Sequence, residues 1–148
     1  MKLRLIQLWL FFILFISFSC KGQNDRDIAK TVGGGCEGCE ALLEYGDMKL
    51  SPVDTLPLFA ETEPKLKLSG TVYEHDGKTP AKDVILYIYH TNREGIYQKK
   101  GDEKGWAGRH GFIRGWAKTD NSGRYTFYTF RPASYPKSSE PAHIHLTI

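Results

Sequence analysis

The second half of the chain alternates between apolar and polar residues with the period of β-strands. Leu66, Leu68 and Val72 alternate with polar neighbours, which predicts a strand that is buried on one face. Residues 84–89 are apolar on both faces, so we expect this strand to be central in its sheet. The same reasoning predicts further strands over residues 112–118, 124–130 and 142–148.

Turns rich in Asp, Gly and Pro, such as residues 76–80, separate these predicted strands. Short strands joined by such turns, with almost no helix, predict an all-β fold: an antiparallel β-sandwich over residues 65–148. Residues 40–48 predict one or two helical turns before Gly46. Residues 51–64 contain three prolines and no periodicity, so they predict an extended linker.

The N-terminus has the layout of an export signal. Lys2 and Arg4 precede an apolar run over residues 5–16. Ser19 and Cys20 follow, and the chain then turns polar, which resembles the lipobox of bacterial lipoproteins. We therefore expect a signal peptide over 1–19, a lipid on Cys20 and a membrane-anchored protein on the periplasmic or cell-surface side. The alternatives are a plain signal peptide with an incidental cysteine, and an uncleaved helix that is short for a full membrane span.

Residues 20–64 are expected to form a tether and a linker rich in Cys and Gly, which holds Cys36 and Cys39. A zinc site would need two more ligands at matching spacing, and no second Cys pair exists in the sequence. In an exported chain, a local disulfide between these two cysteines is the better interpretation. A catalytic thiol pair is the alternative, although no thioredoxin-like pattern surrounds them.

The composition narrows the possible partners. The 148 residues suffice for one domain, and 41% hydrophobic with 25% charged residues is ordinary for a globular protein. The net charge is +3, and basic residues are scattered among acidic ones, which argues against nucleic acid as a partner. The oligomeric state stays open, with a homo-oligomer as one option.

His143 and His145 are the sharpest chemical feature. Side chains two positions apart on a strand point to the same face, so two imidazoles there can converge on one ion. Taken alone, this pattern is as common in ordinary strands as in metal sites. Tyr97 and Tyr135 come earlier in the chain, and the ordinary interpretation of each is a half-buried aromatic. Two phenolates with two neutral imidazoles would favour Fe(III).

Several stretches together resemble the intradiol ring-cleavage dioxygenases, the group that includes protocatechuate 3,4-dioxygenase and catechol 1,2-dioxygenase. The resemblance covers residues 65–148 in order, and its combination of motifs is more specific than any single piece. The matching stretches are residues 84–90, 95–97, 114–127, 131–136 and 141–145.

The resemblance implies that Tyr97, Tyr135, His143 and His145 hold one non-haem Fe(III) ion. It implies a catechol-type substrate that binds as a dianion and displaces Tyr135. The ring would then be cleaved between its two hydroxyl-bearing carbons to a cis,cis-muconate, with both atoms of O2 incorporated. Arg114, near the expected mouth of the site, would act on the substrate, as would Arg109.

Three departures from the family's pattern bear on function. Tyr135 lies closer to His143 than is usual, which shortens the loop at the mouth. Glu140 stands where the family usually carries Arg, so it is expected to act on the substrate by repelling carboxylated rings. The chain stops at Ile148 inside the last predicted strand, so we expect further strands of the family fold to be missing.

A non-catalytic interpretation also fits part of the pattern. The predicted strands between Leu68 and Phe130 equally resemble transthyretin-like and carboxypeptidase-regulatory β-sandwiches, which bind partners. That alternative leaves the two C-terminal histidines unexplained. The other histidines, His75, His90 and His110, are expected to be surface or turn residues.

Overall fold

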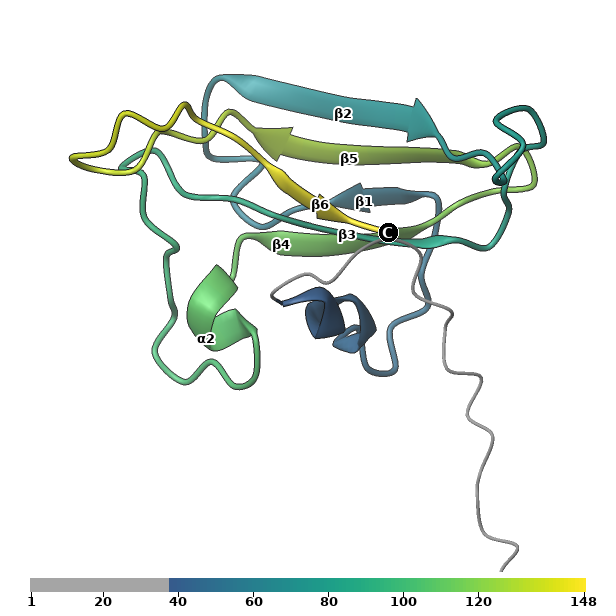
Figure 1. The fold of residues 1–148 in the computed structure, drawn as a ribbon. Helices are drawn as coiled ribbons and strands as arrows, with labels where there is room; N and C mark the ends of the chain where they lie inside the picture. Colours follow the sequence, from purple (N-terminus) through teal and green to yellow (C-terminus); the bar gives the residue numbers. More distant parts are fainter. Residues whose placement is uncertain (1–37) are drawn as a thin grey trace, which may run out of the picture. The chain divides into compact units, whose positions relative to one another are not determined.

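Two three-stranded β-sheets form the body of the protein (Figure 1) in a computed structural model that describes residues 38–148. One sheet has the order β1-β5-β2 and the other the order β4-β3-β6. The pairing of β1 with β5 is parallel, and the other three pairings are antiparallel. The predicted all-β fold is therefore confirmed. The strands are β1 (Val53–Thr55), β2 (Lys65–Thr71), β3 (Ile85–Tyr89), β4 (Arg114–Lys118), β5 (Arg124–Phe130) and β6 (His145–Thr147).

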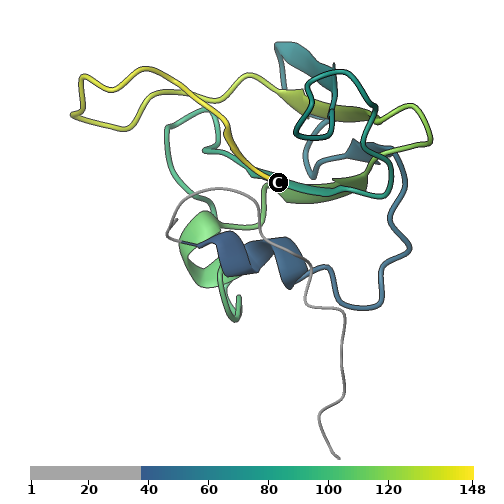
Figure 2. The ribbon, with the colours of Figure 1, turned by 45° about the vertical axis from the view of Figure 1, so that its right-hand side comes forward.

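The hydrophobic core lies between the two sheets. Leu86 and Ile88 of β3 pack there with Phe127 and Phe130 of β5, and all four side chains are fully buried. Figure 2 shows the two sheets as separate layers. Burial of aromatic and branched side chains is the main term that stabilises such a sandwich.

Strand β3 is covered on its other face as well, as its sequence predicted. Tyr87 points to that face and packs with Trp116, Ala41 and Leu42 in a second buried cluster. The covering element is a 3-10 helix, η1 (Cys39–Leu43), which lies on this side of the sheet together with α2 (Ala107–His110) (Figure 1). The predicted helical turns are thus present, and they end at Leu43, before Gly46 as expected.

The boundaries of two strands differ from the prediction. Strand β4 begins at Arg114 rather than Phe112, and β6 begins at His145 rather than Ala142. Residues 131–144 form a loop, so the predicted strand is shorter at its start. The first residues of this loop are hydrogen-bonded to another loop, through contacts described below. His143 therefore precedes the strand that carries His145.

Part of the predicted linker is a strand. Residues 53–55 form β1, beside β5, and the Asp54 carboxylate accepts a hydrogen bond from the backbone N–H of Trp116 at 2.9 Å. Leu56 follows and is buried in the core. The short helix α2 was not predicted, because four residues are too few to show a helical period.

The predicted signal peptide over 1–19, Cys20 and Cys36 lie outside the described residues. Cys39 is in a disulfide bond, which agrees with an oxidised cysteine, while the pairing with Cys36 stays a prediction. Within residues 38–148, none of the helices has the length and the apolar character needed to span a membrane.

Candidate metal centre

Two loops at one end of the sandwich are joined by hydrogen bonds. The first follows β3, and the second follows β5. The Ala133 N–H donates to the Asn92 carbonyl at 3.2 Å, and the Thr91 hydroxyl donates to the Ala133 carbonyl at 2.7 Å. The Arg93 guanidinium adds a bond to the Arg131 carbonyl at 2.9 Å. These contacts bring together two segments that are about forty residues apart in the sequence.

Asn92 also shapes the first loop. Its side-chain oxygen accepts hydrogen bonds from the backbone N–H groups of Glu94 and Ile96, each at 3.0 Å. Such a side-chain turn is typical of asparagine. Gly95 completes the turn with a φ of 76°, a conformation that favours glycine, and lies directly against the Ser134 carbonyl. The turns before Tyr97 and Tyr135 therefore bring the two side chains close together, with their rings tilted by 59°.

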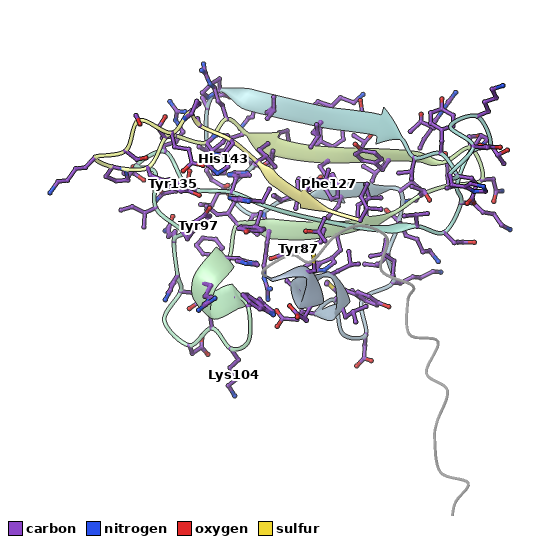
Figure 3. All side chains as sticks on the ribbon, in the orientation of Figure 1. Tyr87, Tyr97, Lys104, Phe127, Tyr135 and His143 are labelled. Carbon is purple, nitrogen blue, oxygen red and sulfur yellow. The ribbon has the colours of Figure 1, made fainter. Side chains whose placement is uncertain are left out.

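The four predicted ligands converge in the structure. The Tyr97 hydroxyl lies 2.5 Å from the Tyr135 hydroxyl and 2.9 Å from Nε2 of His145. The Tyr135 hydroxyl lies 3.1 Å from Nε2 of His143 and 3.3 Å from Nε2 of His145. The two Nε2 atoms are 3.0 Å apart. In Figure 3, the labelled Tyr97, Tyr135 and His143 gather at the same end of the sheets.

This donor set fits a metal ion. Atoms about 3 Å apart surround a point about 2 Å from each of them, which is near the length of a metal–imidazole bond. His143 donates from Nδ1 to the Pro141 carbonyl at 2.8 Å, so its Nε2 carries the lone pair that faces the cluster. Among residues 38–148, His, Cys, Asp and Glu alone form no group of three that could hold a metal, so such a site depends on its tyrosines.

Burial controls the protonation of this cluster. It raises the pKa of Tyr97 well above its usual range, and the hydrogen bond between Tyr97 and Tyr135 raises it further. Burial also lowers the pKa of His145, with a second contribution from the charge of His143. The His145 imidazole is therefore neutral, and its Nε2 can donate an electron pair to a metal ion. Only a strong cation would remove the proton of Tyr97, because a bound ion reverses the local pKa preference.

Arg114 and Glu140, the other two predicted site residues, are not among the side chains whose atoms converge in this cluster. The Arg114 guanidinium forms an ion pair with Glu44 at 2.7 Å and lies over the Trp116 ring at 4.9 Å. Glu140 is exposed on the loop between Tyr135 and His143, and its charge raises the pKa of both Tyr97 and His145. The roles of Arg114 and Glu140 in the reaction stay predictions.

Two histidines expected at the surface are buried instead. His90 is fully buried, and its Nε2 lies 2.6 Å from the Thr129 hydroxyl of β5, so it links the two sheets. His110 is 6% exposed, and its Nδ1 lies 2.9 Å from the Tyr87 hydroxyl. Burial, followed by the charge of Arg114, lowers the pKa of His110 to about 4. His75 is exposed as expected.

Tyr89 was not among the predicted site residues, and its ring stacks on His145 with the centroids 4.4 Å apart. The sequence held one indication of this position, because strand alternation places Tyr87 and Tyr89 on the same face of β3. Only the pairing of β3 with β6 shows that Tyr89 lies opposite His145.

The fold and the site define a β-sandwich that presents two tyrosines and two histidines at one end as a candidate metal centre. A family model described as Dioxygenase matches residues 52–148. The chain therefore belongs to this family, the intradiol ring-cleavage dioxygenases.

Two solved structures of dioxygenases are similar to this chain. The 3-chlorocatechol 1,2-dioxygenase of Rhodococcus opacus 1CP is similar, with 25% identity and a TM-score of 0.50 over 66% of this chain and 44% of that chain. A dioxygenase domain from Streptomyces sp. SirexAA-E has 28% identity and a TM-score of 0.43 over 55% of this chain and 46% of that chain. The chain thus spans less than half the length of these relatives.

Proposed function

We propose that this protein is a non-haem Fe(III) dioxygenase that cleaves a catechol-type ring between its two hydroxyl-bearing carbons. The product would be a cis,cis-muconate containing both atoms of O2. The observation that carries the proposal is the convergence of Tyr97, Tyr135, His143 and His145 at 2.5 to 3.3 Å. The alternative, a non-catalytic binding module, has no use for such a cluster.

The chemistry of the donors favours iron in its ferric state. Phenolate oxygens are hard, anionic ligands, and two of them with two neutral imidazoles suit a trivalent cation better than Zn(II) or Cu(I). When bound, Fe(III) would act as a Lewis acid on the catechol oxygens.

The protein's own residues would orient the site and move protons. The Pro141 carbonyl holds the His143 ring in the tautomer that presents Nε2. Tyr135 lies on a loop, so it could withdraw without breaking a strand. Its phenolate oxygen would accept a proton from one catechol hydroxyl and leave as a neutral phenol.

Glu140 supports a preference for uncharged rings. Its carboxylate acts electrostatically on both Tyr97 and His145, so it would also act on a substrate bound beside these residues. A ring that carries a carboxylate, such as protocatechuate, would be repelled. Catechol or a neutral substituted catechol is therefore the expected substrate.

The visible spectrum of the purified, iron-loaded full chain tests the proposal. Charge transfer from tyrosinate to Fe(III) should give a broad red-brown band. Catechol added with O2 should be converted to a muconate, one molecule for each catechol consumed. A colourless protein that takes up stoichiometric zinc in preference to iron, or one that leaves catechol unchanged, would contradict it.

A further inference from the structure

Tyr89 lies in the centre of a stack of aromatic rings that leads to the candidate metal centre. Its ring lies parallel to that of His145, with centroids 4.4 Å apart and an angle of 4° between the planes. Its contact with the His110 ring is closer still, with centroids 3.7 Å apart and an angle of 5° between the planes. The Tyr89 ring is thus stacked with two imidazoles from different segments of the chain.

The strand register produces this arrangement. Tyr89 is the partner of His145 in the antiparallel pairing of β3 with β6. Residues directly opposite each other on one face of a sheet have their side chains in contact. The same ring also touches Tyr97, with centroids 5.7 Å apart and a tilt of 48°. Tyr89 therefore contacts two of the four proposed ligands.

The far side of the stack is held rigidly. His110 is hydrogen-bonded through Nδ1 to the Tyr87 hydroxyl and stacks on Trp106, with centroids 5.2 Å apart. Gly38 lies directly against the His110 ring, where an added Cβ would be 2.9 Å from Nε2. His110 is thus confined on several sides, and it can hold the Tyr89 ring in place.

We propose that Tyr89 is a positioning residue, whose ring fixes the plane of the His145 imidazole relative to the Tyr97 hydroxyl. A flat ring that is stacked on an imidazole lets the imidazole slide within its own plane but opposes any tilt of that plane. Nε2 of His145 would then stay directed at the point where Tyr97, Tyr135 and His143 meet. The proposal deepens the proposed function and rests on its ligand set, although its first test needs no metal.

That first test uses nuclear magnetic resonance of the metal-free full chain, with the His145 ring signals assigned by their loss in His145→Ala. Ring currents of the stacked Tyr89 should shift these signals upfield in the parent. In Tyr89→Leu they should move downfield and broaden, whereas Tyr89→Phe keeps the ring and should resemble the parent. Tyr125→Leu is the matched control, because Tyr125 is a half-buried tyrosine of β5 that packs on Phe127.

The second test measures iron affinity by competition with a chelator, together with the position of the charge-transfer band. Residues that orient a metal-bound imidazole typically change metal affinity by about 10- to 100-fold, so we expect Tyr89→Leu to weaken iron binding about tenfold and to shift the band. Tyr89→Phe and Tyr125→Leu should stay within about twofold of the parent. If Tyr89→Leu does not fold, His110→Leu removes the other side of the stack and takes its place.

Unchanged His145 signals in Tyr89→Leu, or iron binding equal to that of the parent, would overturn the proposal. A loss of iron matched by Tyr125→Leu would also overturn it, because the effect would then be one of general stability. If the parent bound no iron while its His145 signals still depended on Tyr89, the proposed function would fail and the positioning role would stand.

Discussion

At the residue scale, the candidate centre brings together four donor atoms that a single cation could bind. Two imidazole nitrogens lie 3.0 Å apart, and the pKa of the Tyr97 phenol is raised, so this phenol stays protonated when no cation is bound. A metal ion would satisfy all four donors at once. The ligand set is therefore the first thing to change by mutation.

Replacing single ligands should remove iron. We expect Tyr97→Phe and His145→Ala each to lower iron affinity at least about tenfold, because each deletes one donor atom from the cluster. The measurement is iron per protein after dialysis against a chelator. His75→Ala is the control, since His75 is exposed in a turn. Equal iron in all three variants would place the ligands elsewhere.

Glu140 should control the choice between neutral and carboxylated substrates. Because this carboxylate is exposed, solvent screening reduces its effect, and we expect Glu140→Arg to raise the ratio of kcat/KM for protocatechuate over catechol by about three- to tenfold. Glu140→Gln should give a smaller change in the same direction. Glu74→Arg, at an exposed turn position, is the control for net charge. A ratio that none of these variants alters would mean that Glu140 does not face the substrate.

At the element scale, the turn before Tyr97 determines how closely the two tyrosine loops approach. Gly95 has a positive φ, and a Cβ added there would lie 2.0 Å from the Ser134 carbonyl oxygen. A side chain at this position would push the loop of Tyr135 away from the loop of Tyr97.

Gly95→Ala should therefore destabilise the protein and open the centre. Gly77 is the matched control, because its φ is 67° and no atom lies within 4 Å of an added Cβ. We expect Gly77→Ala to cost about 1 kcal/mol, from the backbone conformation alone. Gly95→Ala should cost at least about 2 kcal/mol more, from the clash. Urea unfolding of the two variants measures the difference, and equal costs would contradict the close contact.

Strand β3 stabilises the fold through both of its faces. Leu86 and Ile88 enter the core between the sheets, and Tyr87 and Tyr89 pack on the outer face with His110. Because His110 is buried and close to Arg114, the folded protein favours its neutral form.

The stability of the metal-free protein should therefore fall in acid. The pKa of His110 decreases from 6.5 to about 4 on folding, so its contribution is complete above pH 6.5 and is lost as the pH falls to about 4. Between about pH 7.5 and pH 4, we expect the parent to lose about 2 kcal/mol more of its unfolding free energy than His110→Phe loses. Urea unfolding at both pH values tests this. A His75→Ala variant should behave like the parent, and equal losses in the parent and His110→Phe would contradict the assignment.

At the scale of the whole molecule, we propose that the protein is exported and anchored by a lipid on Cys20. The support is the charged and apolar run of residues 2–16 followed by Ser19 and Cys20. An oxidised Cys39 agrees with an exported protein.

Cys20→Ser should change where the protein is found. We expect the variant to leave the membrane fraction or to keep its signal peptide, because the lipid that anchors it cannot be attached. Fractionation and electrophoretic migration measure both effects. The control is Ser17→Ala, which keeps the cysteine. A Cys20→Ser variant that fractionates and migrates like the parent would contradict the lipid anchor.

The sequence by itself determined the strands and the identity of the candidate ligands. Alternation from Lys65 to Thr71 and the apolar run before His90 are local patterns, and strand geometry follows from them directly. The motifs around Tyr97, Tyr135, His143 and His145 indicated the family, which the match over residues 52–148 confirms. Residues 53–55 escaped prediction because a strand of three residues shows no alternation.

The tertiary structure alone decided how these residues meet. Tyr97 lies 38 positions before Tyr135 and 48 before His145, so their contact depends on hydrogen bonds between loops and on the pairing of β3 with β6. The burial of His110 and its stacking on Tyr89 arise in the same way. Local sequence patterns report which face of a strand is apolar. They do not report which distant segment covers that face, because that choice is made by the packing of the whole domain.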